Sequence, residues 1–334
     1  MAEHVITIIG AGIAGLWQAL LLARAGHRVT LIEKSDEPFT ASASWYAGAM
    51  LAPYCEEESA EPNVRVLGLR SLEIWKSFMP DLAQAGSLVV AQPRDQSELN
   101  RYAEMTTGHE LIGDKELAEL EPDLSGRFSK ALFYPEEAHL DPRRAMPFLL
   151  DEIRRSGVTV ALGTETIPDG SDIIIDCRGL GAEADLATLR GVRGERAIIR
   201  TQDVKLHRPI RLLHPRFPLY IVPWDDHHYM IGATVIESAD EGKVTLRSAL
   251  ELLSAAYAVH PAFGEAEIIE MSAGVRPAFP DNMPRIIRNG KRLYVNGLYR
   301  HGFLLAPVLA ELVCDHLETG ARHAEVFVEN RLEW

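Results

Sequence analysis

Three glycines near the start of the chain have the spacing of a nucleotide phosphate-binding turn. Gly10, Gly12 and Gly15 form the pattern Gly-x-Gly-x-x-Gly. In such a turn the first glycine allows a tight bend, the second lets the backbone approach a pyrophosphate, and the third lets a helix pack closely on a strand. The positive end of the helix then faces the phosphates. Glu33, 18 residues after Gly15, is placed to accept hydrogen bonds from a ribose diol.

The elements around these residues agree with this interpretation. The apolar run 4–9 predicts a buried strand, residues 16–25 predict a helix that ends before Gly26, and residues 28–32 predict a second strand. Strand, glycine turn, helix, strand and acid make up the βαβ unit that binds dinucleotides. The pattern therefore favours a bound adenine dinucleotide over a glycine-rich turn with a structural role alone.

Composition limits the class of protein. The 334 residues include 34 Lys and Arg against 48 Asp and Glu, a net charge of −14, which disfavours nucleic acid and anionic membranes as partners. Cys55, Cys177 and Cys314 form no Cys-x-x-Cys pair, as is typical of a reducing compartment. We expect a cytoplasmic protein without a leader, without a membrane span and without a metal site. The pair His227-His228 is most simply a polar hairpin tip.

The rest of the chain predicts an α/β protein with an antiparallel sheet inserted in the middle of the sequence. The acidic run 56–61 is expected to be a solvated stretch or a helix start, and Asp114 is expected to be an N-cap. We expect helices at 64–78, 97–106, 114–121, 142–156, 246–259 and 305–317, and strands at 87–91, 131–134, 158–162, 172–176, 197–200, 210–214, 219–222, 229–233, 266–271 and 293–295.

Two further segments allow two interpretations each. Residues 42–53 are mostly small, so their backbone could lie against a flat ligand or could simply pack inside the protein. Residues 177–182 follow an apolar strand and include two glycines. That position suits a ligand site in an α/β fold, but a plain crossover loop has the same pattern.

Four motifs occur together and in order: the N-terminal βαβ unit; residues 43–53 (Ala-Ser-Trp-Tyr-Ala-Gly-Ala-Met-Leu-Ala-Pro); residues 273–277 (Ala-Gly-Val-Arg-Pro) with Pro280-Asp281; and residues 297–307 (Gly-Leu-Tyr-Arg-His-Gly-Phe-Leu-Leu-Ala-Pro). This ordered set resembles the FAD-dependent D-amino-acid oxidase family and is most similar to its ThiO-type glycine oxidases. The resemblance spans the whole chain. It implies a Rossmann-like FAD-binding domain (1–82, 140–196 and 273–334) interleaved with an antiparallel substrate domain (83–139 and 197–272).

The resemblance implies FAD as the cofactor. The flavin would pass the loop 43–50, and the backbone of 300–304 would face its pyrimidine edge. The implied cofactor-binding residues are Gly10, Gly12, Ile13, Ala14, Gly15, Glu33, Lys34, Ala43, Ser44, Gly48, Ala49, Met50, Arg300, His301, Gly302, Phe303 and Leu304. Relatives with covalent flavin carry a cysteine near the Arg-Pro motif, and residues 272–287 contain none, so we expect non-covalent FAD. Ala49 stands where glycine is usual, which affects the expected path of the loop.

The resemblance also implies three catalytic residues. Arg276 would anchor the substrate carboxylate, Tyr220 would donate its hydroxyl to it, and Arg300 would lie close by. A planar guanidinium suits a carboxylate in a dry pocket. Taken alone, Arg276 could be a surface residue and Tyr220 a core residue, while His301 and His139 are expected to be structural. Hydride transfer from Cα to flavin N5 leaves an imine and requires no protein base, so the protein's task is orientation.

The function implied is oxidative deamination of glycine, sarcosine or small D-amino acids to an imine or glyoxylate, ammonia and H2O2, in thiamine biosynthesis. Its partners would be a small amino-acid substrate and O2, and the resemblance implies a homo-oligomer, a tetramer or dimer. One alternative is a D-amino-acid or sarcosine dehydrogenase with another electron acceptor. A second is a flavoprotein with a structural role. A nicotinamide-dependent reductase is disfavoured because the chain has no second Gly-x-Gly-x-x-Gly for that cofactor.

Overall fold

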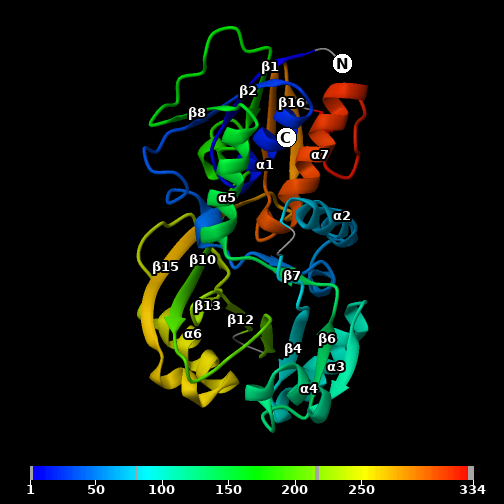
Figure 1. Ribbon diagram of the computed structural model, residues 1–334, viewed down its shortest axis with the longest axis vertical. Coiled ribbons are helices and arrows are strands. Elements are labelled where there is room, and N and C mark those ends of the chain that lie inside the picture. The colour runs from blue at the N-terminus through cyan, green and yellow to red at the C-terminus, as the bar shows by residue number, and fades with distance from the viewer. Residues whose placement is uncertain (1–2, 80–81, 215–217, 330–334) are drawn as a thin grey trace.

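The computed structural model describes residues 3–79, 82–214 and 218–329. Its described strands form a seven-stranded sheet in the upper half of Figure 1 and a nine-stranded sheet in the lower half. The strands of the first sheet, in spatial order, are β18 (Phe327–Glu329), β16 (Arg285–Asn289), β17 (Arg292–Asn296), β9 (Ile173–Asp176), β1 (Val5–Ile9), β2 (Arg28–Glu33) and β8 (Thr159–Leu162). All of its pairings are parallel except β16 with β17.

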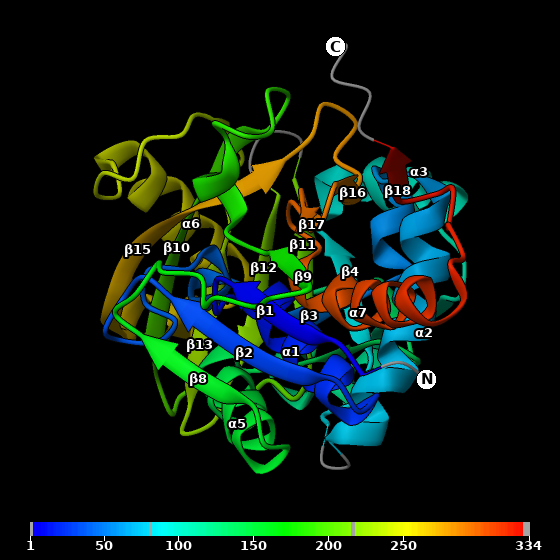
Figure 2. The same cartoon turned by 90° about the horizontal axis from the view of Figure 1, so that it is seen from above.

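Apolar side chains pack a layer of helices against one face of this sheet. Strand β1 is rich in isoleucine, which favours a strand buried on both faces. Helices α1 (Ile13–Arg24), α5 (Pro142–Arg155) and α7 (Gly302–Thr319) lie on one face, as Figures 1 and 2 show, and their buried side chains share one core. Helix α2 (Pro62–Phe78) joins it through Trp75, whose ring centroid lies 4.8 Å from that of Trp17 in α1. The strand order puts the turn after β1 beside the turn after β9.

The second sheet is mostly antiparallel. Its strands are, in spatial order, β14 (Ile236–Glu237), β10 (Arg190–Arg200), β13 (His228–Gly232), β12 (Leu219–Pro223), β11 (Ile210–Leu213), β4 (Ser87–Ala91), β6 (Lys130–Tyr134) and β5 (Glu110–Gly113), with β15 (Glu267–Ala278) also paired to β10. Strands β4 and β11 are parallel. Helices α3 (Gln96–Met105), α4 (Asp114–Leu120) and α6 (Leu246–Val259) accompany this sheet, and β3 (Met50–Leu51) pairs with β7 (Ala138–His139).

The predicted fold class is confirmed, and every expected helix and strand is present, but four details were wrong. Strands β10 and β15 are longer than expected, because they pair from Arg190 opposite Ala278 along charged and glycine-rich segments that lack apolar alternation. Short strands such as β5 and β16 were not predicted. Helix α4 is capped by Gly113, whose N–H donates to Glu116, so Asp114 is its first residue and not its N-cap. Helix α7 begins at Gly302 and not at Leu305.

The boundaries between the two expected domains remain a proposal. Strand β10 extends across the boundary expected at 196 and β15 across the one at 272, and both strands belong entirely to the nine-stranded sheet. Among the described residues, no helix is long and apolar enough to cross a membrane.

Candidate active site

The glycine turn after β1 leaves an open backbone at the start of α1. Gly10 has φ +98°, and a Cβ on it would lie 2.8 Å from the carbonyl oxygen of Cys177. A Cβ on Gly15 would overlap the carbonyl oxygen of Gly10, closer than 3.0 Å, so helix and strand pack as closely as the glycine pattern predicts. Gly12, the N-cap of α1, is less crowded, since a Cβ there would meet only Ser44 and Ser42, at 3.5 Å or more.

Glu33 stands at the end of β2, beside this turn. One carboxylate oxygen accepts the Ala11 N–H at 2.8 Å, and the other accepts the Ser35 N–H at 3.1 Å. These two bonds fix the side chain against the cavity wall. A carboxylate has about four acceptor positions, so Glu33 can still accept from a ligand's hydroxyl groups.

The small-residue loop runs along the same cavity. It forms a short 3-10 turn at Ala43–Tyr46, and Ser44 Oγ accepts the Ile13 N–H at 3.1 Å. Ala49 has φ +50°, a left-handed conformation that favours glycine, which agrees with the glycine that the resemblance implies at this position. A Cβ on Gly48 would overlap the Met230 side chain, so here the loop packs directly against the second sheet.

One cavity of about 410 Å³ connects these features to the second sheet. Every site residue predicted from the sequence lines it, except Gly15, which lies beneath the turn. The turn after β9, whose role the sequence left open, also lines it from Cys177 to Gly181. The cavity thus extends from the glycine turn to side chains of β12 and β15.

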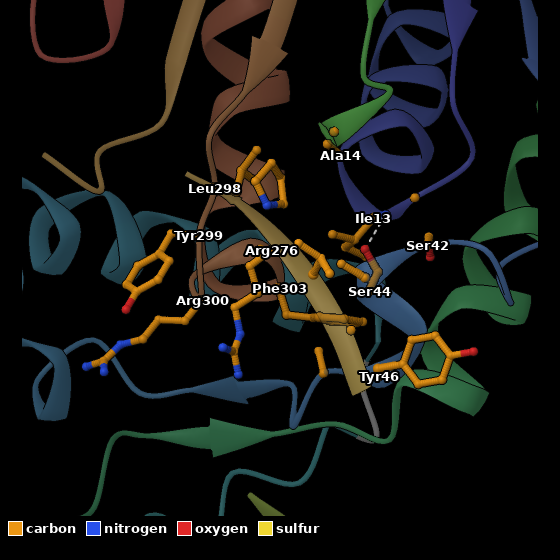
Figure 3. Close-up of a pocket in the computed structure, with 18 of the residues that line it drawn as sticks. Ile13, Ala14, Ser42, Ser44, Tyr46, Arg276, Leu298, Tyr299, Arg300 and Phe303 are labelled. Atoms are coloured by element: carbon orange, nitrogen blue, oxygen red, sulfur yellow. Dashed lines mark hydrogen bonds between the residues drawn. The ribbon is translucent and has the colours of Figure 1, made fainter. Parts of the chain in front are cut away.

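At that second end Arg276 points into the cavity (Figure 3). Its guanidinium extends over Gly194, where a Cβ would overlap it, and its Nη1 donates to the Thr234 carbonyl at 3.2 Å. Among the described residues, the Thr234 carbonyl is the hydrogen-bond acceptor for the Arg276 guanidinium. The other N–H groups of the guanidinium therefore remain available to a ligand. Tyr220 of β12 lines the same end, next to Gly48 and Gly232.

Arg300 lines the cavity, but its guanidinium points away from Arg276 (Figure 3). Its Nε donates to Glu56 at 2.7 Å and its Nη2 to the Ser59 hydroxyl at 2.9 Å. A direct contact with a substrate would require Arg300 to exchange these partners. The predicted role of Arg300 beside the substrate therefore stays a prediction.

Glu56 was missed, and the prediction of a solvated stretch is wrong at this residue. It is buried, lines the cavity, and accepts from Arg211 of β11 at 3.0 Å as well as from Arg300. Burial raises its pKa, but Arg300, His301 and Arg211 more than offset burial and hold the pKa far below its usual range. An arginine within the apolar strand 210–213 was the one signal that could have indicated a buried acid.

His301, the N-cap of α7, lies within this charged cluster. It is 3% exposed, and its Nδ1 lies 3.5 Å from Glu56. Burial lowers its pKa to about 4, Glu56 opposes that shift, and Arg300, Arg211 and Arg276 add to it. The ring is therefore neutral at pH 7.

This shift predicts a loss of stability in acid. Because the pKa of His301 is lower in the folded state, the unfolded state binds the proton between about pH 6.5 and 4, and the stabilisation present above pH 6.5 is lost as pH falls. Between pH 7 and pH 5, the free energy of unfolding of a His301→Gln variant should fall by about 2 kcal/mol less than that of the parent protein. Urea unfolding of both proteins at the two pH values measures this. Equal losses would show that folding leaves the pKa of His301 near its ordinary value.

Comparisons with known proteins show the family of this chain. A model of the DAO family, FAD dependent oxidoreductase, matches residues 6–316. The chain belongs to this family. It is 50% identical over 316 residues to a Rhizobium etli protein that carries the provisional name thiamine biosynthesis oxidoreductase ThiO, covering 94% of this chain and 96% of that one. It is 26% identical over 366 residues to a glycine oxidase of Pseudomonas aeruginosa, covering 94% of each.

A solved structure shows the same fold. Glycine oxidase from Bacillus cereus superposes with a TM-score of 0.82 at 22% identity, over 96% of this chain and 99% of that one. The predicted family and the prediction of an FAD-dependent oxidoreductase are confirmed. The roles of the individual site residues remain predictions.

The cavity fits FAD on its own chemistry. Gly12 leaves the backbone open where a pyrophosphate would approach, and as an N-cap without a side chain it provides no side-chain cap for the first turn of α1. Glu33 offers carboxylate oxygens at the end of β2, the position expected for a ribose. Gly302, Phe303 and Leu304 form the first turn of α7 and also line the cavity.

Proposed function

We propose that this protein oxidatively deaminates glycine, and also sarcosine or small D-amino acids, as a ThiO-type glycine oxidase of thiamine biosynthesis. Glycine, O2 and water would yield glyoxylate, ammonia and H2O2. The observation that carries the proposal is Arg276, whose guanidinium faces the same cavity as the glycine turn and the loop 43–50. The names of the Rhizobium etli and Pseudomonas aeruginosa relatives support it.

In this proposal the protein positions the substrate. Arg276 donates N–H groups to the carboxylate, and Tyr220 donates its hydroxyl to the same group, which limits the orientations open to Cα. Two N–H donors in a fork distinguish a carboxylate from a neutral group. A substrate whose amine is neutral needs no protein base to lose the hydride. Glu56, the acid that lines the cavity, is held by two arginines that keep its pKa low, so no base is assigned to it.

Non-covalently bound FAD would supply the two-electron acceptor for the hydride from Cα. The chain's own contribution there is the first turn of α7. Its N–H groups at Gly302–Leu304 and its positive dipole end favour negative charge on a neighbouring group. His301 remains neutral and adds no charge at this point.

The test is anaerobic reduction of the purified yellow protein. We expect glycine to bleach the flavin absorbance, and air to restore it rapidly with formation of peroxide. Sarcosine, D-alanine and D-proline are added separately to rank substrates. Slow recovery in air would favour a dehydrogenase with another acceptor, and bleaching by larger D-amino acids alone would exclude glycine. If none of these compounds bleached the flavin, the assignment to amino acids would be wrong.

We also propose, on the resemblance alone, that the protein is cytoplasmic and homo-oligomeric, as a tetramer or dimer. Sedimentation of the FAD-loaded protein determines the oligomeric state.

A further inference from the structure

We propose that a buried ion pair between Arg193 and Glu195 positions Arg276 for carboxylate binding. The pair contacts neither the cavity nor Arg276 directly, so both residues are positioning residues. The inference rests on the proposed role of Arg276 as the carboxylate anchor. It concerns the back of the cavity wall, on the side of β10 that faces α6.

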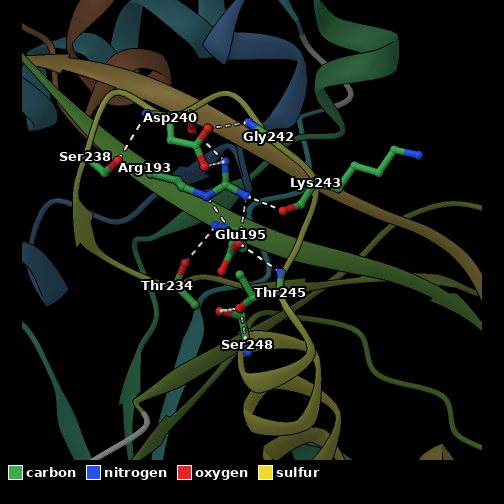
Figure 4. A network of polar contacts seen from close by, with 9 residues as sticks. All are labelled: Arg193, Glu195, Thr234, Ser238, Asp240, Gly242, Lys243, Thr245 and Ser248. Carbon is green, nitrogen blue, oxygen red and sulfur yellow. Dashed lines mark hydrogen bonds and ion pairs between the residues drawn. The ribbon is translucent and has the colours of Figure 1, made fainter.

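The pair is closed off from solvent. Arg193 and Glu195 lie two residues apart on β10, so their side chains share one face of the sheet, and the residues are 3% and 0% exposed. Arg193 donates to Glu195 Oε1 from Nε at 3.1 Å and from Nη2 at 2.8 Å (Figure 4). Replacing such a pair with apolar residues often costs no stability, so net stabilisation is a weak explanation for it.

The pair fastens the segment that connects β14 to α6. Arg193 donates from Nη1 to the Asp240 carbonyl at 2.6 Å and from Nη2 to the Lys243 carbonyl at 2.8 Å. Glu195 Oε1 also accepts the N–H of Thr245, the N-cap of α6, at 3.3 Å. As Figure 4 shows, the two charged side chains thus hold three backbone positions of one loop. Glu241 lines the cavity from this loop.

Strand β10 also supports Arg276, through hydrogen bonds between the backbone of Glu195 and Thr234. The N–H of Glu195 donates to Thr234 Oγ1 at 2.8 Å, and the N–H of Thr234 donates back to the Glu195 carbonyl at 3.1 Å. The Thr234 carbonyl accepts from Arg276 Nη1. Gly194, between the two members of the pair, is the residue over which the guanidinium lies. Arg276 therefore rests on a strand segment whose opposite face is fixed by the pair.

Loss of the pair should disturb this support. A buried Glu195 or Arg193 without its partner would draw in water or shift β10, and Gly194 and Thr234 would move with it. A displacement of about 1 Å at a binding group can cost roughly 100-fold in rate or affinity. The effect should fall on carboxylate binding, because the pair lies on β10 of the nine-stranded sheet, whereas the glycine turn follows β1 of the seven-stranded sheet.

The experiment uses the FAD-loaded full chain with Glu195→Gln and Arg193→Met, which keep side-chain volume and remove the ion pair. Acetate binding is followed by perturbation of the flavin spectrum, since acetate offers a carboxylate but no amine to oxidise. We expect the Kd for acetate and the KM for glycine to rise together by roughly 10- to 100-fold. The kcat at saturation should change less than about threefold, with FAD content unchanged.

The matched control is the exposed pair of Arg200 on β10 and Glu267 on β15, joined at 3.1 Å. Arg200→Met and Glu267→Gln should leave the Kd and KM within about twofold, since surface pairs contribute little. If a variant of the buried pair fails to fold, Thr234→Val removes only the hydroxyl link to β10, and it should weaken acetate binding in the same direction.

Two results overturn the inference: a normal Kd for acetate in a variant that lacks the pair, or parallel losses of FAD content and kcat, which indicate a structural role alone. Arg276→Ala separates this from failure of the proposed function. If Arg276→Ala binds acetate as well as the parent does, the anchor has been assigned wrongly. If Arg276→Ala binds acetate weakly while the variants of Arg193 and Glu195 bind it as well as the parent does, only the positioning role is wrong.

Discussion

An Arg276→Ala variant is expected to keep its FAD and lose its oxidation of amino acids. The substitution removes the guanidinium at the second end of the cavity and leaves the glycine turn and Glu33 intact. Loss of one partner of a buried, hydrogen-bonded charge pair costs about 2–5 kcal/mol, or roughly 30- to 4,000-fold in kcat/KM. The main loss should be in KM and in acetate affinity, because the carboxylate is bound in both the ground state and the transition state.

Steady-state kinetics with glycine, together with FAD content, measure this effect. Arg285→Ala is the matched control, because Arg285 is partly buried like Arg276 and has a polar partner, Asp281 at 3.1 Å, but does not line the cavity. Arg276→Lys should restore only part of the affinity, since an ammonium lacks the planar fork. A full kcat/KM in Arg276→Ala would contradict the assignment and direct attention to Arg211 and Arg300.

The parts of the site that could be predicted are those with local signals. The glycine turn, α1 and β2 follow one another within thirty residues, so periodicity and spacing were sufficient to locate them. Arg276 required the ordered motifs, because an arginine before a proline has no distinctive local chemistry. The alanine at position 49 indicated that the loop has an unusual path there, but it did not reveal the left-handed backbone that Ala49 adopts.

The charged clusters in and behind the cavity wall could not be predicted, because most of their contacts join segments far apart in the sequence. Glu56 meets Arg211 155 residues later and Arg300 244 residues later, and nothing in the run 56–58 indicates which acid turns inward. Arg193 and Glu195 lie within a strand segment without apolar alternation, which the pattern did not identify as a strand. Both clusters depend on contacts between distant segments, and such contacts are a property of the whole fold.

Gly12 and Gly15 are expected to respond differently to the same methyl group. On Gly15 the Cβ would overlap the Gly10 carbonyl, a backbone atom that cannot rotate away. Gly15→Ala should therefore force apart α1 and β1, costing at least the 1–3 kcal/mol typical of overpacking and lowering Tm by roughly 2–10 °C with or without FAD. On Gly12 the nearest atom would be Ser44 Oγ at 3.5 Å, and its φ of −69° suits any residue.

Gly12→Ala should accordingly leave the Tm of the FAD-free protein unchanged and weaken FAD binding by at least about tenfold, or 1.4 kcal/mol, because its methyl group lies where the pyrophosphate would approach the backbone. Thermal unfolding of deflavinated protein and titration with FAD separate the two effects. Unchanged FAD affinity in Gly12→Ala would mean that the pyrophosphate lies elsewhere. A stable Gly15→Ala would mean that the turn can widen, and the close approach of α1 to β1 would then not be what requires glycine at that position.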